Sequence, residues 1–330
     1  MPFSRRLFVL GALAAPLAAQ TKALAQAQGP AAAWPSGTIR IVVPFPPGGT
    51  VDPIARMAQP GLQQKLGATV IVENRPGASG SVGTGAVAKS PPDGNSWVFV
   101  FDTHAVNPFL LNMTFDTVKD LEPVLLIGTA PNVLCTHPSR PFKSFADVVA
   151  AAKAKPNTLS YASIGSGSVG HLTMTLLAKR AGISLVHVPY RGGGPAMNDA
   201  LAGHVDMIIG SAALVTPQVN ADKIRPLLQT GKTRMTTLAN VPTAIENGFA
   251  GFESYAWWGV FAPAGTPKPV IERFAATLTE ILRDPAISNR LSQNLQITLR
   301  MGGPQEQRQF LTEQMALWAP VVKENNIKPD

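Results

Sequence analysis

The sequence predicts an α/β fold organised as two domains. Short apolar runs alternate with stretches of helical periodicity, and the alternation occurs in two series separated by extended segments at 125–135 and 254–261. The chain has 330 residues, of which 45% are hydrophobic, so it is long enough to bury two cores. Because two segments cross between the series, we expect residues 36–127 and 256–330 to form domain 1 and residues 128–255 to form domain 2.

Residues 1–25 have the three parts of an export signal. Arg5 and Arg6 precede an apolar run at 7–19, and the A-x-A pattern at 23–25 provides a cleavage site. The apolar run is shorter than the ~20 residues that span a bilayer. A twin-arginine route and the general secretory route both stay open. We expect a mature protein that is soluble in the periplasm.

Charge and residue usage exclude several classes of function. The formal charge is +8, and loss of Arg5, Arg6 and Lys22 with the signal leaves +5 on the mature chain. Lysines and arginines are scattered without a run of four, so we expect no nucleic-acid partner. The five histidines lack metal-ligand spacing, and no metal or other cofactor is expected. Cys135 is the only cysteine, which excludes an internal disulfide.

The first series opens on a strand at 39–43, a glycine-rich loop at 44–52 and a helix that we expect to begin at Pro53. Asp52 has the short acceptor side chain of an N-cap residue, and proline suits the first helical position. The helix should end near Gly67, which suits a C-terminal cap.

This loop is a candidate anion site. Gly48, Gly49 and Thr50 leave backbone N–H groups uncovered at the positive end of a helix dipole. We interpret the arrangement as a seat for a ligand carboxylate. An ordinary glycine-rich β–α turn is the alternative.

The first domain continues with a strand at 69–73, a short helix at 82–89 and a strand at 96–101. Thr103 and His104 follow the last of these strands. Ligands bind at the carboxyl ends of strands in open α/β sheets, so we expect both residues near the ligand. For His104, and for His171 of the second series, bracing of the loop is the alternative to direct ligand contact.

The second series repeats the pattern of the first. A helix at 144–153 and a strand at 159–162 lead to a Gly/Ser loop at 163–171, which feeds another helix N-terminus. Serine hydroxyls there can donate to a ligand. The candidate contacts on this loop are Ser163, Gly165, Ser166, Gly167, Ser168, Val169 and His171.

Two further candidates follow later strands of the second series, Tyr190 after a strand at 185–189 and Ser211 after a strand at 205–209. The chain then forms a strand at 225–229 and the return crossing. We expect the remainder to be helical, at 269–282, 285–295 and 305–323.

Three motifs point weakly to enzymes. Residues 165–170 resemble a phosphate-binding loop but lack its lysine, and the G-x-G-x-x-A pattern at 83–88 does not emerge from a strand. Ser168 lies in S-x-S-x-G rather than the G-x-S-x-G of a nucleophile elbow. An exported hydrolase or other enzyme using the same cleft is therefore the alternative, and we expect no catalytic residue.

Four motifs in order resemble one family. P-F-P-P-G-G-T-V-D at 44–52, E-N-R-P-G-A-S-G at 73–80, T-H-A-V-N-P at 103–108 and V-P-Y-R-G-G-G-P-A at 188–196 are similar to the substrate-binding receptors of tripartite tricarboxylate transporters, the Bug/TctC family. The resemblance implies a two-domain type II periplasmic binding protein fold. It also implies a receptor that closes on a small carboxylate and delivers it to membrane permease subunits. We expect the protein to be a monomer.

The resemblance further implies where the ligand lies. It would be held between the first loop, from Gly48 through Thr50 and Val51 to Asp52, and the loop at 163–171, with Phe45 against its carbon skeleton. Asp102 stands where the family commonly has a small residue, and Gln218 replaces a common histidine. These departures leave the ligand open among di- and tricarboxylates, amino acids and aromatic acids. A sensor for a membrane signalling partner is an alternative to transport.

Overall fold

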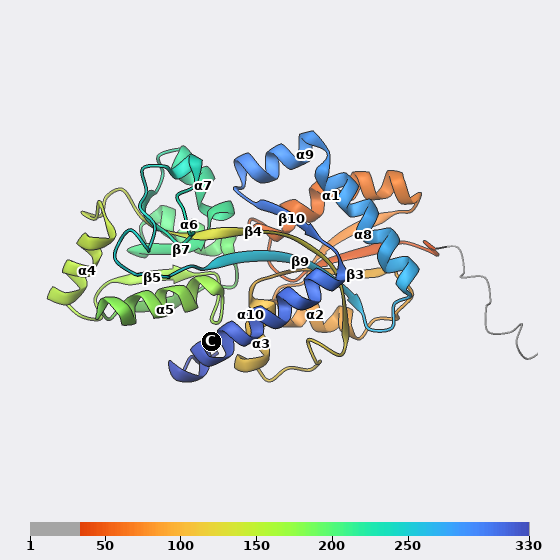
Figure 1. Cartoon of the computed structure of the whole chain (residues 1–330), viewed down its shortest axis with the longest axis horizontal. Coiled ribbons are helices and arrows are strands. Elements are labelled where there is room, and N and C mark those ends of the chain that lie inside the picture. The colour runs from red at the N-terminus through yellow and green to blue at the C-terminus, as the bar shows by residue number, and fades with distance from the viewer. Residues whose placement is uncertain (1–33, 330) are drawn as a thin grey trace, which may run out of the picture.

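The computed structural model describes residues 34–329, and the predicted signal at 1–25 lies outside them. Figure 1 shows two groups of helices at the ends of a long sheet, with strands β4 (Leu121–Thr136) and β9 (Tyr255–Pro263) running between them. These two strands pair antiparallel from Leu121 opposite Pro263 to Pro131 opposite Tyr255. The chain thus forms two α/β domains joined by two crossing strands, while the domain bounds stay a prediction.

Domain 1 is built around three parallel strands. Strand β1 (Ile39–Val43) lies between β2 (Val70–Asn74) and β3 (Ser96–Phe101), and β3 pairs antiparallel with β9. The edge strand β10 (Thr298–Gly302) pairs antiparallel with β4. The carboxyl ends of β1 and β3 therefore meet at one edge of the sheet.

Domain 2 continues from the far end of β4. That end pairs antiparallel with β7 (Met207–Ser211) and β8 (Arg225–Gln229). Strand β5 (Ser160–Ser163) is parallel to β7 and to β6 (Val186–Pro189). The sheet order β2-β1-β3-β9-β4-β7-β5-β6 therefore passes from one domain to the other through β9 and β4.

Helices cover both domains (Figure 1), and among residues 34–329 none is both long and apolar enough to cross a membrane. In domain 1 they are α1 (Val51–Leu66), α2 (Ser81–Ala88), α3 (Thr103–Leu110), α8 (Lys268–Arg283), α9 (Pro285–Asn289) and α10 (Pro304–Glu324). In domain 2 they are α4 (Phe145–Ala154), α5 (Val169–Ala181), α6 (Gly193–Ala202) and α7 (Ala212–Asn220). Single helical turns occupy Ala78–Gly80, Thr236–Leu238 and Arg290–Asn294.

The N-cap assignment of Asp52 is wrong. Helix α1 begins at Val51 with Thr50 at its N-cap position, so Asp52 is its second residue. The Asp52 carboxylate instead accepts hydrogen bonds from Arg56 Nε at 2.9 Å and Asn74 Nδ2 at 2.8 Å. The bond to Asn74 connects α1 to the end of β2, so the carboxylate is engaged there and does not cap the helix. The end at Gly67, which has φ +66°, is confirmed.

Two other expectations need correction. No helix was predicted after the strand at 96–101, but residues Thr103–Leu110 form α3. The C-terminal region, expected to be helical, contains the strand β10. The helix expected at 285–295 breaks after five residues of α9 into a single π-helical turn at Arg290–Asn294. Strand β10 has only a short local strand pattern, and its pairing with β4 decides its conformation.

Candidate ligand site between the two domains

A cavity of about 20 Å³ lies between the domains, room for roughly one water molecule. Both domains contribute to its walls. It is lined by Phe45, Gly49, Thr50, Val51 and Phe101 from domain 1 and by Ile164, Gly192, Gly193, Ser211 and Leu214 from domain 2.

Three helix N-termini converge on this cavity. Helix α1 begins after Thr50, α6 after Gly192 and α7 after Ser211, and all three of these N-cap residues are in the lining. The first N–H groups of a helix have no partner within it, and the helix dipole places positive potential there. The lining contains no lysine, arginine or histidine. Backbone N–H groups and hydroxyls are therefore what this site offers to an anion.

The cavity also has two hydroxyl groups. The Thr50 oxygen accepts a hydrogen bond of 3.0 Å from Trp258 Nε1, so the Thr50 hydroxyl hydrogen remains to be donated. Ser211 is 1% exposed, and its Oγ has no hydrogen-bond partner among the described residues. A buried hydroxyl left unpaired costs ~1–3 kcal/mol, which a ligand oxygen within reach would remove.

An aromatic wall closes the domain 1 side. Phe45 meets Phe101 edge to face at 6.2 Å between ring centroids, and Phe101 lies 5.4 Å from Trp258. Ile164 and Leu214 face these rings from domain 2 as part of the same cavity lining. The site thus combines polar groups at helix ends with apolar walls suited to a carbon skeleton.

The two domains meet backbone to backbone beside the cavity. A Cβ atom on Gly194 would lie 2.8 Å from the Pro47 carbonyl oxygen, and one on Gly48 would lie 3.4 Å from Gly194 Cα. Gly48 also has φ +87°, which disfavours other residues. Side chains are therefore excluded from this contact, which describes a closed arrangement of the domains.

Five of the predicted ligand residues line the cavity, namely Phe45, Gly49, Thr50, Val51 and Ser211. Gly48 lies at the adjoining domain contact. The Asp52 carboxylate is held by Arg56 and Asn74, and Asn74 also donates to the Phe45 carbonyl at 3.0 Å. Asp52 thus braces the loop, while its ligand contact stays a prediction.

Ser163, Ser168 and His171 of the second loop are engaged within domain 2. Ser163 Oγ donates to the Gly165 carbonyl at 3.1 Å, and Ser168 Oγ accepts from the His171 N–H at 3.3 Å. The His171 ring stacks on His187 at 3.7 Å and accepts from the Gly167 N–H. Burial lowers the pKa of His171 to about 3, with a smaller contribution from His187, so the ring is neutral.

The rest of this loop contacts domain 1. Ser79 Oγ donates to the Ser166 carbonyl at 3.0 Å, and the Val169 N–H donates to Asp102 Oδ1 at 3.3 Å. A Cβ atom on Gly167 would lie 2.7 Å from Leu110 Cδ2. The loop thus forms an interdomain contact, while Ile164 is its member in the cavity lining. Ligand contact by its other residues stays a prediction.

The remaining three candidates are bonded or packed outside the lining of this cavity. Thr103 Oγ1 donates to the Ser79 carbonyl at 2.7 Å, and His104 packs on Phe261 at 4.7 Å, where burial lowers its pKa to about 3. Tyr190 Oη donates to Asp199 at 2.6 Å, and partial burial raises the Tyr190 pKa to about 12. Their roles in binding stay predictions.

Sequence reasoning missed five lining residues, Phe101, Ile164, Gly192, Gly193 and Leu214. A signal existed for the glycines, because they form a glycine-rich loop after the strand predicted at 185–189, as the first loop does after the strand at 39–43. The apolar residues gave none, since they resemble core residues of strand ends and helices.

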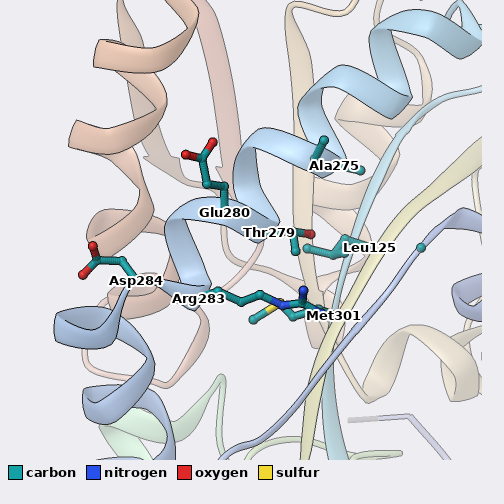
Figure 2. Close-up of a pocket in the computed structure, with 9 residues that line it drawn as sticks. Leu125, Ala275, Thr279, Glu280, Arg283, Asp284 and Met301 are labelled. Carbon is teal, nitrogen blue, oxygen red and sulfur yellow. The ribbon is translucent and has the colours of Figure 1, made fainter.

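A larger groove of about 620 Å³ lies on the outer face of domain 1 (Figure 2). Glu280 and Arg283 of α8 and the following residue, Asp284, border it, with Leu125 and Met301 nearby. Glu280 is paired with Lys65 of α1. Its lining residues all belong to domain 1, so it lacks the two-sided enclosure of the interdomain cavity. No group of three metal-ligating side chains occurs among residues 34–329.

The sequence and fold match known proteins over most of the chain. The family described as "Tripartite tricarboxylate transporter family receptor" matches residues 54–327. A UPF0065 protein from the tcbD-tcbE intergenic region of Pseudomonas sp. strain P51 is 38% identical over 294 residues, covering 88% of this chain and 87% of that protein.

Two solved structures share the architecture. R. palustris Rpa4515 with adipate gives a TM-score of 0.85 at 32% identity, over 90% of this chain and 100% of that one. The periplasmic binding protein BugD gives 0.84 at 31% identity, with the same coverage. The chain therefore belongs to the tripartite tricarboxylate transporter receptor family and has the two-domain type II fold of its periplasmic binding proteins.

Proposed function

We propose that this chain is an extracytoplasmic receptor that binds a small carboxylate between its domains by hinge closure and delivers it to a tripartite tricarboxylate-type permease. It acts as an exported, soluble monomer after cleavage of residues 1–25. Binding is reversible and involves no covalent chemistry.

The convergence of three helix N-termini on one interdomain cavity supports this proposal most strongly. Helix α1 comes from domain 1, and α6 and α7 come from domain 2. A carboxylate between them interacts favourably with all three dipoles only when the domains are closed. Binding therefore favours the closed state, as hinge closure requires.

The size of the cavity requires motion. A cavity of about 20 Å³ cannot admit a dicarboxylate, so the ligand enters while the domains are apart, and the side chains of the lining shift to hold it when the domains close. Strands β4 and β9 are the covalent connections about which the domains turn. The α1 end belongs to domain 1, and the α6 and α7 ends move toward it with domain 2 as the domains close.

The ligand class follows from the lining and from a relative. Apolar walls and uncharged donors suit a short carbon chain with one or two carboxylates, and Rpa4515 has been solved with adipate. We propose that this chain binds a ligand of that chemistry, with one carboxylate at the α1 end.

Calorimetric titration of mature protein tests the proposal. The panel contains adipate, citrate, aspartate and benzoate, so that it covers the four carboxylate classes. We expect saturable heat and a higher melting temperature with at least one class. No heat and no thermal shift across the panel would refute the proposal.

A variant then locates the site. Gly49→Val places methyl groups into the cavity, because a Cβ at Gly49 has only ordinary contacts at 3.9 Å and the backbone there is unstrained. We expect a folded protein with sharply reduced affinity. Unchanged affinity would show that the ligand binds elsewhere, for example in the groove of Figure 2.

Turnover separates a receptor from an enzyme. The bound ligand should be recovered unchanged after prolonged incubation. Product that disappears in Ser168→Ala would favour an exported hydrolase, and the melting temperature of that variant must be followed because Ser168 Oγ caps α5.

A further inference from the structure

Asp102 occupies the helix end that sequence reasoning assigned to the ligand. It follows β3 in domain 1, and its Oδ1 accepts from the Val169 N–H, the first residue of α5 in domain 2, at 3.3 Å. The chain's own carboxylate thus sits at the positive end of α5. The hydrogen bond joins the two domains, so it can exist only while they are closed.

The surroundings of this carboxylate are dry. Asp102 is 0% exposed, and Oδ2 has no hydrogen-bond partner among the described residues. Beside it, Val106 of α3, Val169 and Leu172 of α5 and Trp318 of α10 form one buried apolar cluster. Closing the domains therefore removes this carboxylate from water.

Few titratable groups face this position. On its own helix, His104 is buried and held neutral by its low pKa, and on α5 the neutral His171 stacks on His187 of β6. Helix α10 contributes Trp318 and Val322 to the apolar cluster. Asp102 takes part in none of the ion pairs found among residues 34–329. Within the described part of the chain, no cationic side chain is thus paired with its charge.

We propose that Asp102 is a proton-linked clasp, a positioning residue whose protonation accompanies domain closure and makes ligand affinity depend on pH. The inference rests on the hinge closure of the proposed function. It assigns the α5 end to the protein's own carboxyl group and leaves the ends of α1, α6 and α7 to the ligand.

The direction of the pH dependence follows from burial. Burial raises the pKa of Asp102 well above its ordinary value, against the smaller lowering effect of the Val169 and Thr103 N–H groups. Opening returns the carboxyl to water and to an ordinary pKa near ~3.9. The contribution to closure is therefore fully present below the pKa of the open form and is lost as pH rises through the pKa of the closed form.

Asp102→Asn isolates this effect. Asparagine keeps the acceptor for the Val169 N–H and resembles the protonated acid, but it does not titrate. We expect the wild type to match the variant at low pH and to bind adipate more weakly at high pH, with the ratio of dissociation constants growing by up to about tenfold per pH unit. Protonation of adipate cancels in this ratio.

The experiment titrates both proteins with adipate between about pH 5 and 8.5. Repeating each titration in buffers of different ionisation enthalpy measures the number of protons taken up on binding, and the wild type should take up more protons than the variant. Asp147→Asn is the matched control, because Asp147 also lies at a helix N-terminus but bonds only within domain 2. Its ratio to wild type should not change with pH. A flat ratio for Asp102→Asn would refute the clasp and leave a structural role.

Small-angle scattering of ligand-free protein provides an independent readout. At high pH the Asp102→Asn variant should be more compact than wild type, and the two should converge at low pH. If adipate gives no heat with either protein, the adipate proposal fails while scattering still decides the role of Asp102. Superimposable scattering at every pH in that case would refute the clasp.

Discussion

The loops before α1 and α5 have similar sequences but different surroundings. Each follows a strand, contains glycines and a hydroxyl residue, and leads into a helix. The α1 end opens on the interdomain cavity through Thr50, whereas the α5 end is filled by Asp102. A helix end supplies uncovered N–H groups, but the fold decides whether a ligand or a side chain of the same protein meets them.

The two loops therefore have different roles in the cleft. In the proposed function, the α1 loop, together with α6 and α7, forms the seat for an external anion. The α5 loop contacts Ser79 and Asp102 across the domain boundary, so these contacts require the domains to be closed. Substitutions at the first set should change ligand affinity directly, and those at the second should act through closure or stability.

Gly194→Ala should have the largest effect. Alanine is favourable inside α6, but its Cβ would lie 2.8 Å from the Pro47 carbonyl oxygen across the closed contact. Overpacking costs about 1–3 kcal/mol, so we expect roughly 10- to 100-fold weaker binding of adipate by calorimetry, with domain 2 intact. Gly303→Ala is the control, because nothing lies within 4 Å of its Cβ position. Equal affinities of the two variants would show that closure does not bring these loops together.

Thr50→Val should weaken binding by about tenfold, since a hydrogen bond to a charged group contributes ~1.5–3 kcal/mol. The variant also leaves the buried Trp258 N–H without its acceptor, so its melting temperature should fall. Thr50→Ser should restore both properties. Unchanged affinity in Thr50→Val would show that the Thr50 hydroxyl does not contact the ligand anion.

Ser211→Ala should separate affinity from stability. Its hydroxyl is buried in the cavity wall without a described partner, so removal should leave the free energy of unfolding unchanged or higher. Loss of a donor to the ligand should reduce affinity about fivefold, near the ~1 kcal/mol of an average hydrogen bond. Urea titration and calorimetry measure the two quantities. A less stable protein with unchanged affinity would contradict the assignment.

Ser168→Ala should show the smallest change in affinity. Loss of the α5 cap should lower the free energy of unfolding by ~1 kcal/mol, measured by urea titration, while adipate affinity stays within about twofold. A tenfold loss of affinity in Ser168→Ala at unchanged stability would place the α5 loop in the ligand seat after all.

Much of the fold was predictable because its signals are local. Ile39–Val43 and Ser96–Phe101 are apolar runs bounded by turn residues, and the structure confirms both strands. Strand β10 was missed although its first four residues alternate between exposed and partly buried, because an alternation of four residues is short and lies within a region of helical periodicity. Its pairing with β4, which is distant in the sequence, fixes it as a strand.

The site was predictable only in part. The first loop was found from the glycines and the helix start that follows, and Thr50 and Gly49 do line the cavity. Which loop faces it from domain 2 depends on how the domains meet, and the α6 and α7 ends, not the α5 loop as a whole, take that place. The occupation of α5 by Asp102 joins residues 67 positions apart, so neither segment predicts it alone.

Trp258 gives the protein an optical reporter. Its indole N–H donates to Thr50 at the proposed anion seat, while its backbone belongs to β9, one of the two strands that connect the domains. Trp257, its neighbour, points to the opposite side and packs on Phe310. Emission from Trp258 should therefore shift when the seat fills, whereas Trp257 supplies a steady background within the same strand.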